Sequence, residues 1–256
     1  MSSRLWTKIQ NCYRSNSARW VFRRPRAVRL QRPMISFTFD DFPRTALTAG
    51  GEILNQHGLS ATYYVALGLM GQDSPSGPIC NSDDLVTLLE QGHELGSHTF
   101  SHCHSWETEG ATFEASIIEN EIALSKLVPG AKFRSFSYPI GEPRPLTKRR
   151  TGKHFQCCRA GGQTLNSGTA DLNQLAAFFL ERSKGGLQAI RDLIDRNREA
   201  RGWTILATHD ISPNPSPYGC TPKLFEEVVQ YAINSGACIL PVARALDVLA
   251  GSGPKI

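Results

Sequence analysis

The sequence lacks a long apolar run, since none approaches the roughly 18 consecutive apolar residues that a membrane-spanning helix requires. It also lacks a continuous apolar stretch behind its basic N-terminus, because Arg and Lys recur throughout residues 1–33. This pattern excludes a secretory signal peptide. We therefore expect a protein that stays in the cytoplasm.

Cysteines in the spacing of a redox or zinc motif are also missing. The seven cysteines include no Cys-x-x-Cys pair, and their number is odd. A disulfide framework is not expected in a chain of this length without an export signal. We interpret the thiols as buried, reduced side chains.

Acidic residues are absent from residues 1–33, which contain nine of the 28 basic residues. The remainder has 19 basic against 23 acidic residues, so it lacks the charge pattern of a nucleic-acid-binding protein. We expect residues 1–33 to be a poorly ordered basic tail and residues 34–256 to be one folded domain. Apolar residues interleaved with the basic ones leave contact with a membrane surface open as a less favoured alternative. These apolar residues are Trp6, Ile9, Tyr13 and Trp20.

Strand-like and helix-like segments alternate from Met34 onward. This alternation predicts an α/β fold with a parallel sheet, either closed into a barrel or open and doubly wound. The expected strands are 35–39, 61–66, 94–98, 133–138, 155–158, 203–208 and 238–242. The expected helices include residues up to 54, a segment that Ser82 caps, 111–127, 187–200, a segment that Thr221 caps and 243–249.

Ionisable residues follow three of the expected strands. Asp40 and Asp41 end the first strand, His98 ends another, and His209 follows the strand 203–208. In a barrel the C-terminal strand ends converge on the face that carries catalysis. His98 and His102 would share one side of a helical turn. Each feature alone is more often structural, but their combination predicts a functional site.

These residues resemble the motifs of the polysaccharide deacetylases, which form carbohydrate esterase family four and contain the NodB homology domain. Thr38-Phe39-Asp40-Asp41 and His98-Thr99-Phe100-Ser101-His102 are similar to the first two motifs, and residues 136–141 are similar to the third. Leu206-Ala207-Thr208-His209-Asp210 is similar to the last motif. The resemblance implies a distorted, incomplete (β/α) barrel that contains one divalent metal, usually Zn²⁺.

The resemblance also implies a role for each matching residue. Asp41, His98 and His102 would hold the metal, a ligand set that zinc accepts in catalytic sites. Asp40 would be the general base that takes a proton from the attacking water, and His209 would protonate the leaving amine. The backbone N–H of Ile140, in the segment Tyr138-Pro139-Ile140, would stabilise the oxyanion.

The chain departs from the family pattern at several positions. Ser137 stands where the third motif commonly has an Arg that supports the base, so Arg159 or Arg134 is expected to replace it. The carboxylate partner of the acid histidine is not identified, with Asp171 and Asp195 as candidates. His104 is an alternative to His102 as a metal ligand.

The resemblance implies a metal-dependent hydrolase that removes N-acetyl groups from a saccharide and releases acetate. The substrate would be an oligo- or polysaccharide of the N-acetylglucosamine type or a glycolipid headgroup. Two alternatives are a catalytically inactive glycan-binding barrel and a hydrolase of a small non-sugar amide. A third is a binding module whose basic tail contacts nucleic acid or an anionic membrane. Nucleic acid is not expected as a partner.

Overall fold

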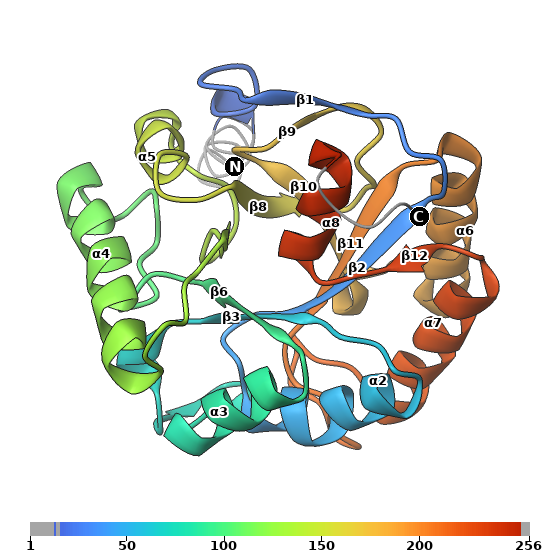
Figure 1. Cartoon of the computed structure of the whole chain (residues 1–256), viewed down its shortest axis with the longest axis horizontal. Coiled ribbons are helices and arrows are strands. Elements are labelled where there is room, and N and C mark those ends of the chain that lie inside the picture. The colour runs from blue at the N-terminus through green and yellow to red at the C-terminus, as the bar shows by residue number, and fades with distance from the viewer. Residues whose placement is uncertain (1–12, 14–15, 252–256) are drawn as a thin grey trace, which may run out of the picture.

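A closed ring of parallel strands forms the centre of the protein (Figure 1). The computed structural model describes residue 13 and residues 16–251. Neighbouring strands pair in parallel, and β11 pairs with β2 from Trp203↔Met34 to Thr208↔Phe39, which closes the sheet. The ring strands are β2 (Met34–Phe39), β3 (Thr62–Val65), β6 (Glu94–Ser97), β7 (Ser135–Ser137), β8 (Cys157–Gly162), β10 (Leu175–Phe179) and β11 (Trp203–Thr208). The expected distorted, incomplete (β/α) barrel is confirmed, since seven strands form the ring instead of the usual eight.

Helices surround the ring on its outer side (Figure 1). They are α2 (Glu52–Gln56), which continues the π-helical turn η1 (Ala46–Gly51), α3 (Ser82–Glu90), α4 (Gly110–Leu127), α5 (Pro145–Thr151), α6 (Gly186–Ala200) and α7 (Pro222–Asn234). Thr221 caps α7 as expected, because its side chain accepts the Leu224 N–H. The cap of α3 is Asn81, one residue before the expected Ser82, and it forms a capping box with Asp84. In the described residues no helix combines the length and apolarity needed to cross a membrane.

Alternation along each strand separates the outer core from the barrel interior. Ile35, Phe37 and Phe39 of β2 pack in the larger apolar cluster together with residues of the surrounding helices. The intervening residues Ser36 and Thr38 are buried and polar. The strand period of two therefore assigns Asp40, which follows Phe39, to the inward-facing set.

The two ends of β2 have different neighbours on one side. β3 pairs with Thr38 and Phe39, whereas the short β12 (Cys238–Ile239) pairs with Met34 and Ile35. α8 (Val242–Ala250) then closes the N-terminal end of the ring, where the Val242 N–H donates to Thr62 Oγ1 over 2.9 Å. The C-terminal ends of the ring strands, which we call the mouth, lie at the opposite end.

No sequence pattern predicts β10 (Leu175–Phe179). The strand has only five residues, and four of them are buried, so neither alternation nor length distinguishes it. It lies between β9 (Gly168–Asp171) and the single turn η3 (Leu180–Arg182). The hairpin of β4 (Asp73–Ser74) and β5 (Gly77–Pro78) and the turn η2 (Leu67–Leu69) are likewise too short for a sequence pattern.

The expected poorly ordered tail does not extend to residue 33. β1 (Pro25–Val28) pairs antiparallel with β9, and Val28 and Leu30 are buried in the apolar cluster at the N-terminal end of the barrel. The Arg24 side chain donates to the carbonyls of Phe155 and Gln156. These contacts order a basic segment because the barrel supplies backbone partners that the sequence does not reveal. Trp6 and Ile9 of the expected tail lie outside the described residues, while Tyr13 and Trp20 are exposed.

Candidate active site and metal centre

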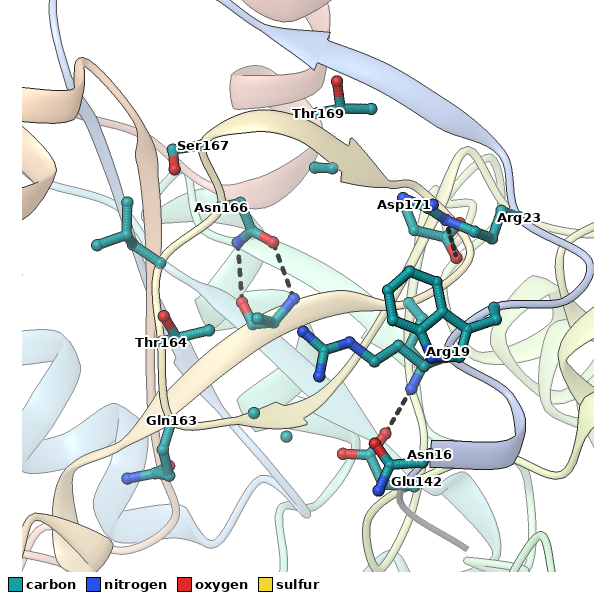
Figure 2. Close-up of a pocket in the computed structure, with 17 residues that line it drawn as sticks. Asn16, Arg19, Arg23, Glu142, Gln163, Thr164, Asn166, Ser167, Thr169 and Asp171 are labelled. Atoms are coloured by element: carbon teal, nitrogen blue, oxygen red, sulfur yellow. Dashed lines mark hydrogen bonds and ion pairs between the residues drawn. The ribbon is translucent and has the colours of Figure 1, made fainter. Parts of the chain in front are cut away.

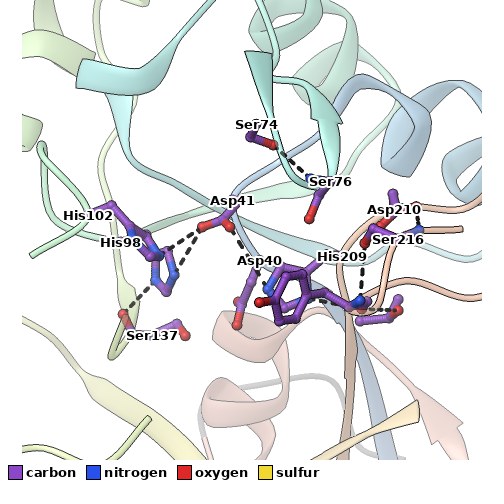
Figure 3. A network of polar contacts seen from close by, with 12 residues as sticks. Asp40, Asp41, Ser74, Ser76, His98, His102, Ser137, His209, Asp210 and Ser216 are labelled. Carbon is purple, nitrogen blue, oxygen red and sulfur yellow. Dashed lines mark hydrogen bonds and ion pairs between the residues drawn. The ribbon is translucent and has the colours of Figure 1, made fainter. Parts of the chain in front are cut away.

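The mouth of the barrel contains a cavity of about 410 Å³. Asp40 and Asp41 follow β2, His98 follows β6 and His209 follows β11, and all four line this cavity. Figure 3 shows these side chains converging from separate strands. His102 also lines the cavity, so the structure brings together the five residues that the sequence indicated.

Asp41, His98 and His102 form a cluster with the composition of a metal site. Asp41 Oδ1 lies 3.5 Å from His98 Nε2 and 3.1 Å from His102 Nε2, and the potential ligand atoms all lie within 4.8 Å of one another. Asp41 Oδ1 is buried and makes no hydrogen bond within the described part of the chain. A buried oxygen without such a partner, facing two imidazole nitrogens, fits a divalent cation.

The protonation chemistry of the cluster also fits a cation. His98 Nδ1 lies 2.8 Å from the Ser137 carbonyl oxygen, to which it donates, so Nε2 keeps its lone pair toward Asp41. Burial lowers the pKa of His98 to about 4, which keeps the ring neutral. Burial raises the pKa of the Asp41 carboxyl, but His102, His98 and His209 lower it by more, so this pKa lies well below its usual value.

Irregular backbone, not a helix, places the second histidine. Residues 98–104 contain no helical turn, and His102 has a left-handed φ of 51°. The Thr99 side chain accepts the Cys103 N–H over 2.9 Å and stabilises this loop. The expected helical turn is therefore wrong, although the rings do meet. Asp41 (φ 61°) is also left-handed, a conformation that costs free energy in a non-glycine residue and occurs often at functional sites.

Asp40 is paired with Arg159. Arg159 Nη2 donates to Asp40 Oδ1, and the two residues are only 1% and 4% exposed. The guanidinium lies over the Tyr64 ring at 4.6 Å and over the Phe179 ring at 5.5 Å from their centroids. These rings fix the guanidinium plane, so the carboxylate has a rigid, charged partner.

Arg134, the other expected support for Asp40, is not at the mouth. It precedes β7, so it lies at the N-terminal end of the barrel, where its side chain pairs with Asp247 of α8. Arg134 precedes a parallel strand and Asp40 follows one, so the height of the barrel separates them.

His209 is held by a backbone carbonyl. Its Nδ1 lies 3.1 Å from the Tyr218 carbonyl oxygen, and its Nε2 lies 3.9 Å from Asp41 Oδ2. Asp210 points away and accepts the Ser216 N–H over 2.9 Å, which shapes the loop that carries Tyr218 (Figure 3). Neither expected carboxylate reaches His209, because Asp171 pairs with Lys148 and Asp195 accepts from Tyr231.

The segment Tyr138-Pro139-Ile140 forms one side of the mouth. Tyr138 and Pro139 are buried, and the Tyr138 hydroxyl donates to the Asn173 carbonyl over 3.2 Å. Ile140 is 62% exposed with a φ of 58°, and its N–H meets no acceptor among the described residues. A positive φ is unusual for a β-branched residue. Because Ile140 lines the cavity, its N–H is open to a ligand there.

Two features of the site were missed by the sequence reasoning. Glu181 follows β10 at the mouth, and its two carboxylate oxygens are buried without a hydrogen bond in the described residues. Burial raises the pKa of Glu181 to about 7. Arg182 lines the cavity beside it. Recognition of β10 would have indicated both, because they occupy the C-terminal end of a ring strand.

His104, the alternative to His102 as a ligand, accepts the Trp106 N–H at Nδ1 and is not part of the ligand cluster.

The family of this chain is evident from comparison with known proteins. Residues 27–154 match the polysaccharide deacetylase family. A chitooligosaccharide deacetylase of Sinorhizobium fredii is 27% identical over 110 residues, which cover 43% of this chain and 47% of the relative. The matched stretches cover between 8% and 48% of the length of the curated relatives, which is less than half of each of them.

Solved structures agree with the fold. The chitin deacetylase of Colletotrichum lindemuthianum has a TM-score of 0.62 at 17% identity, covering 88% of this chain and 91% of its own. A family 4 acetyl xylan esterase from Clostridium thermocellum, in complex with a cobalt ion, has a TM-score of 0.60 at 23% identity, covering 86% and 93%. The family match covers half of the sequence, and the ring of strands carries the expected motif residues at its mouth. The chain belongs to the polysaccharide deacetylase family.

Proposed function

We propose that the chain is a metal-dependent hydrolase that removes N-acetyl groups from a saccharide and releases acetate. One observation carries the proposal. A cluster of two imidazoles and a carboxylate shares a single cavity with a buried Asp–Arg pair and a third imidazole. This is the set of groups needed for water attack on an amide: a cation site, a base and an acid.

Asp41, His98 and His102 would hold the metal, with zinc as the expected ion. A divalent metal bound there supplies a Lewis acid that polarises the acetamide carbonyl and makes water more acidic. Three protein ligands leave coordination positions free for substrate, which is typical of catalytic sites. The solved acetyl xylan esterase with cobalt supports a divalent cation at this kind of site.

Asp40 would accept the proton of the attacking water. Arg159 donates its hydrogen bond to Oδ1, and the second oxygen, Oδ2, accepts no hydrogen bond from the described residues. The hydrogen bond from Arg159 holds the orientation of a carboxylate that is shielded from solvent. Arg159 therefore acts as a positioning residue for the base.

Ile140 and His209 would serve the later part of the reaction. The Ile140 N–H would donate to the oxyanion that develops on the acetyl oxygen. His209 would protonate the amine nitrogen through Nε2, because the Tyr218 carbonyl accepts a hydrogen bond from Nδ1. An amide nitrogen is a poor leaving group until it is protonated. The products are acetate and an amino sugar.

The substrate class is supported by the relatives. The curated matches include chitooligosaccharide deacetylases and a chitin deacetylase, so an N-acetylated saccharide is the substrate that we propose. A cavity of about 410 Å³ accommodates one sugar unit with its acetamido group.

Acetate release tests the proposal. Purified protein is mixed with N-acetylated chitooligosaccharides, with and without chelator, and zinc is added back to the chelated sample. We expect acetate from the untreated and zinc-restored samples and none under chelator. Saccharide binding without any acetate release would indicate a glycan-binding barrel, and acetate release from small amides alone would indicate the non-sugar hydrolase. Either outcome would refute the proposed activity.

A further inference from the structure

A second, larger cavity of about 570 Å³ adjoins the mouth. Its walls are the ordered N-terminal segment 16–23, the end of β8, the connection 163–167 and β9. Figure 2 shows Arg19 reaching from the N-terminal segment across this cavity toward Asn166 and Gln163. This N-terminal wall lies before residue 27, where the family match begins.

The cavity lining is rich in hydrogen-bonding groups. Gln174 Oε1 is buried and has no hydrogen bond in the described residues, although Gln174 Nε2 donates to Glu142 over 2.5 Å. Thr164, Ser167 and Thr169 add hydroxyl groups. A buried acceptor without a partner is costly unless a ligand or water satisfies it. The lining therefore suits a ligand with many hydroxyl groups.

A positively charged side chain and an aromatic ring also line the cavity. Asp171 is neutralised by buried Lys148 at 2.6 Å. Arg19 also lines the cavity, where its positive charge acts on Glu142. Trp20 is 69% exposed, and Arg19 Cζ lies 5.5 Å from its ring centroid. An exposed indole at the rim of a polar cavity offers a flat apolar face beside donors, which matches the two kinds of surface on a pyranose.

The two cavities meet at Gly161. This residue lines both of them, and a Cβ built on it would have Glu142 Oε1 as its nearest neighbour, at 3.5 Å. Because the position has no side chain, no group of β8 separates the cavities at this point. Glu142 lines the second cavity while its neighbour Gly141 lines the mouth. A saccharide chain could therefore extend from one cavity to the other.

We propose that the second cavity binds a further sugar unit of the saccharide whose N-acetylated unit occupies the mouth, with Trp20, Arg19 and Gln174 as its contacts. The inference rests on the proposed function and narrows it to oligosaccharides of at least two units. The N-terminal segment then determines which chain lengths the enzyme prefers.

The test compares two ligands on the full chain. The methyl glycoside of N-acetylglucosamine reaches only the mouth, whereas fully N-acetylated chitotetraose reaches both cavities. We expect Trp20→Ala and Arg19→Ala each to lower kcat/KM for the tetramer by about tenfold, equivalent to about 1.4 kcal/mol, while kcat/KM for the methyl glycoside stays unchanged. Arg196→Ala, at an exposed position of α6, is the control and should change neither value.

Calorimetric binding of the same two ligands separates this inference from the proposed activity. A wild-type protein that binds the tetramer more tightly than the methyl glycoside, with the difference lost in the variants, supports the second cavity even if no acetate is released. Variants that keep the wild-type preference, or that lose affinity equally for both ligands while unfolding at the wild-type temperature, would overturn it.

Discussion

Arg159 donates a hydrogen bond to Asp40 across the barrel interior, although the two residues are 119 positions apart in the sequence. β8 and β2 are not neighbours in the sheet, so only closure of the ring brings these side chains together. Arg159 supplies a positive charge beside Asp40, whereas Ser137, at the third-motif position where an arginine is common, has none.

Arg159→Met should lower kcat by about 10- to 100-fold, the usual effect of losing a residue that orients a catalytic group. Loss of the guanidinium removes the hydrogen bond to Asp40 Oδ1, so the rate should fall while the bound metal is retained. Arg159→Lys should restore part of the rate. Arg134→Met removes an arginine at the other end of the barrel and serves as the control. An unchanged kcat in Arg159→Met would remove Arg159 from the mechanism.

Asp40→Asn should reduce kcat by about two to four orders of magnitude, the range for loss of a general base. The variant should retain its metal, because Asp40 is not one of the clustered ligands. Elemental analysis of the purified variant measures the metal. Asp83→Asn, at an exposed position in the first turn of α3, should change neither quantity. Loss of metal from Asp40→Asn would mean that the roles of Asp40 and Asp41 are exchanged.

His98→Ala should abolish metal retention and activity, since its Nε2 is one of three potential ligand atoms. His104→Ala is the matched control, because His104 follows the same strand but lies outside the cluster. We expect His104→Ala to bind one metal equivalent and to hydrolyse substrate at the wild-type rate. If His104→Ala lost the metal while His102→Ala kept it, the assignment of the second imidazole would be wrong.

His93 should make the fold sensitive to acid. Burial lowers the pKa of His93 to about 4. Its Nδ1 accepts the Ala61 N–H over 3.1 Å, which it can do only while this nitrogen is unprotonated. The unfolded chain takes up this proton near pH 6.5. The folded pKa is the lower one, so the contribution of His93 to stability is complete above pH 6.5 and is lost as the pH falls toward 4.

The expected loss of unfolding free energy between pH 7 and pH 5 from this group is about 2 kcal/mol. His93→Asn retains an acceptor and cannot titrate, so its unfolding free energy should fall less over this interval by about that amount. Urea unfolding at the two pH values measures both proteins. His57→Asn, at an exposed position, should behave as the wild type. An equal pH dependence in wild type and His93→Asn would contradict the prediction.

Deleting residues 1–33 should destabilise the fold. The deletion removes the β1–β9 pairing and two buried apolar side chains, Val28 and Leu30, each worth about 1.5–3 kcal/mol. It also removes the Ala18 carbonyl that accepts from buried Lys148. Deletion of residues 1–12 removes none of these contacts and is the control. Thermal unfolding compares the two, and an unchanged midpoint in the longer deletion would show that β1 adds nothing to stability.

The sequence by itself determined the fold class and the identity of the mouth residues. Period-two alternation in segments such as 35–39 and 203–208 indicates which side chains face the helices. Asp40 and His209 directly follow the last residues of these segments. The order and spacing of Asp40-Asp41 and His98-x-x-x-His102 predict a functional site, and the resemblance of these motifs to those of the polysaccharide deacetylases implies the metal-ligand roles.

Only the tertiary structure decided the partners of these residues. The choice of Arg159 over Arg134 depends on the end of the barrel that each occupies. The second cavity depends on the N-terminal segment 16–23 and on β10, whose five residues carry no periodic signal. The N-terminal segment appears as a charged tail in sequence, yet Val28 and Leu30 become buried because β9 offers an unpaired strand edge. The contact between Arg159 and Asp40, which are 119 positions apart, depends on ring closure, which no local pattern contains.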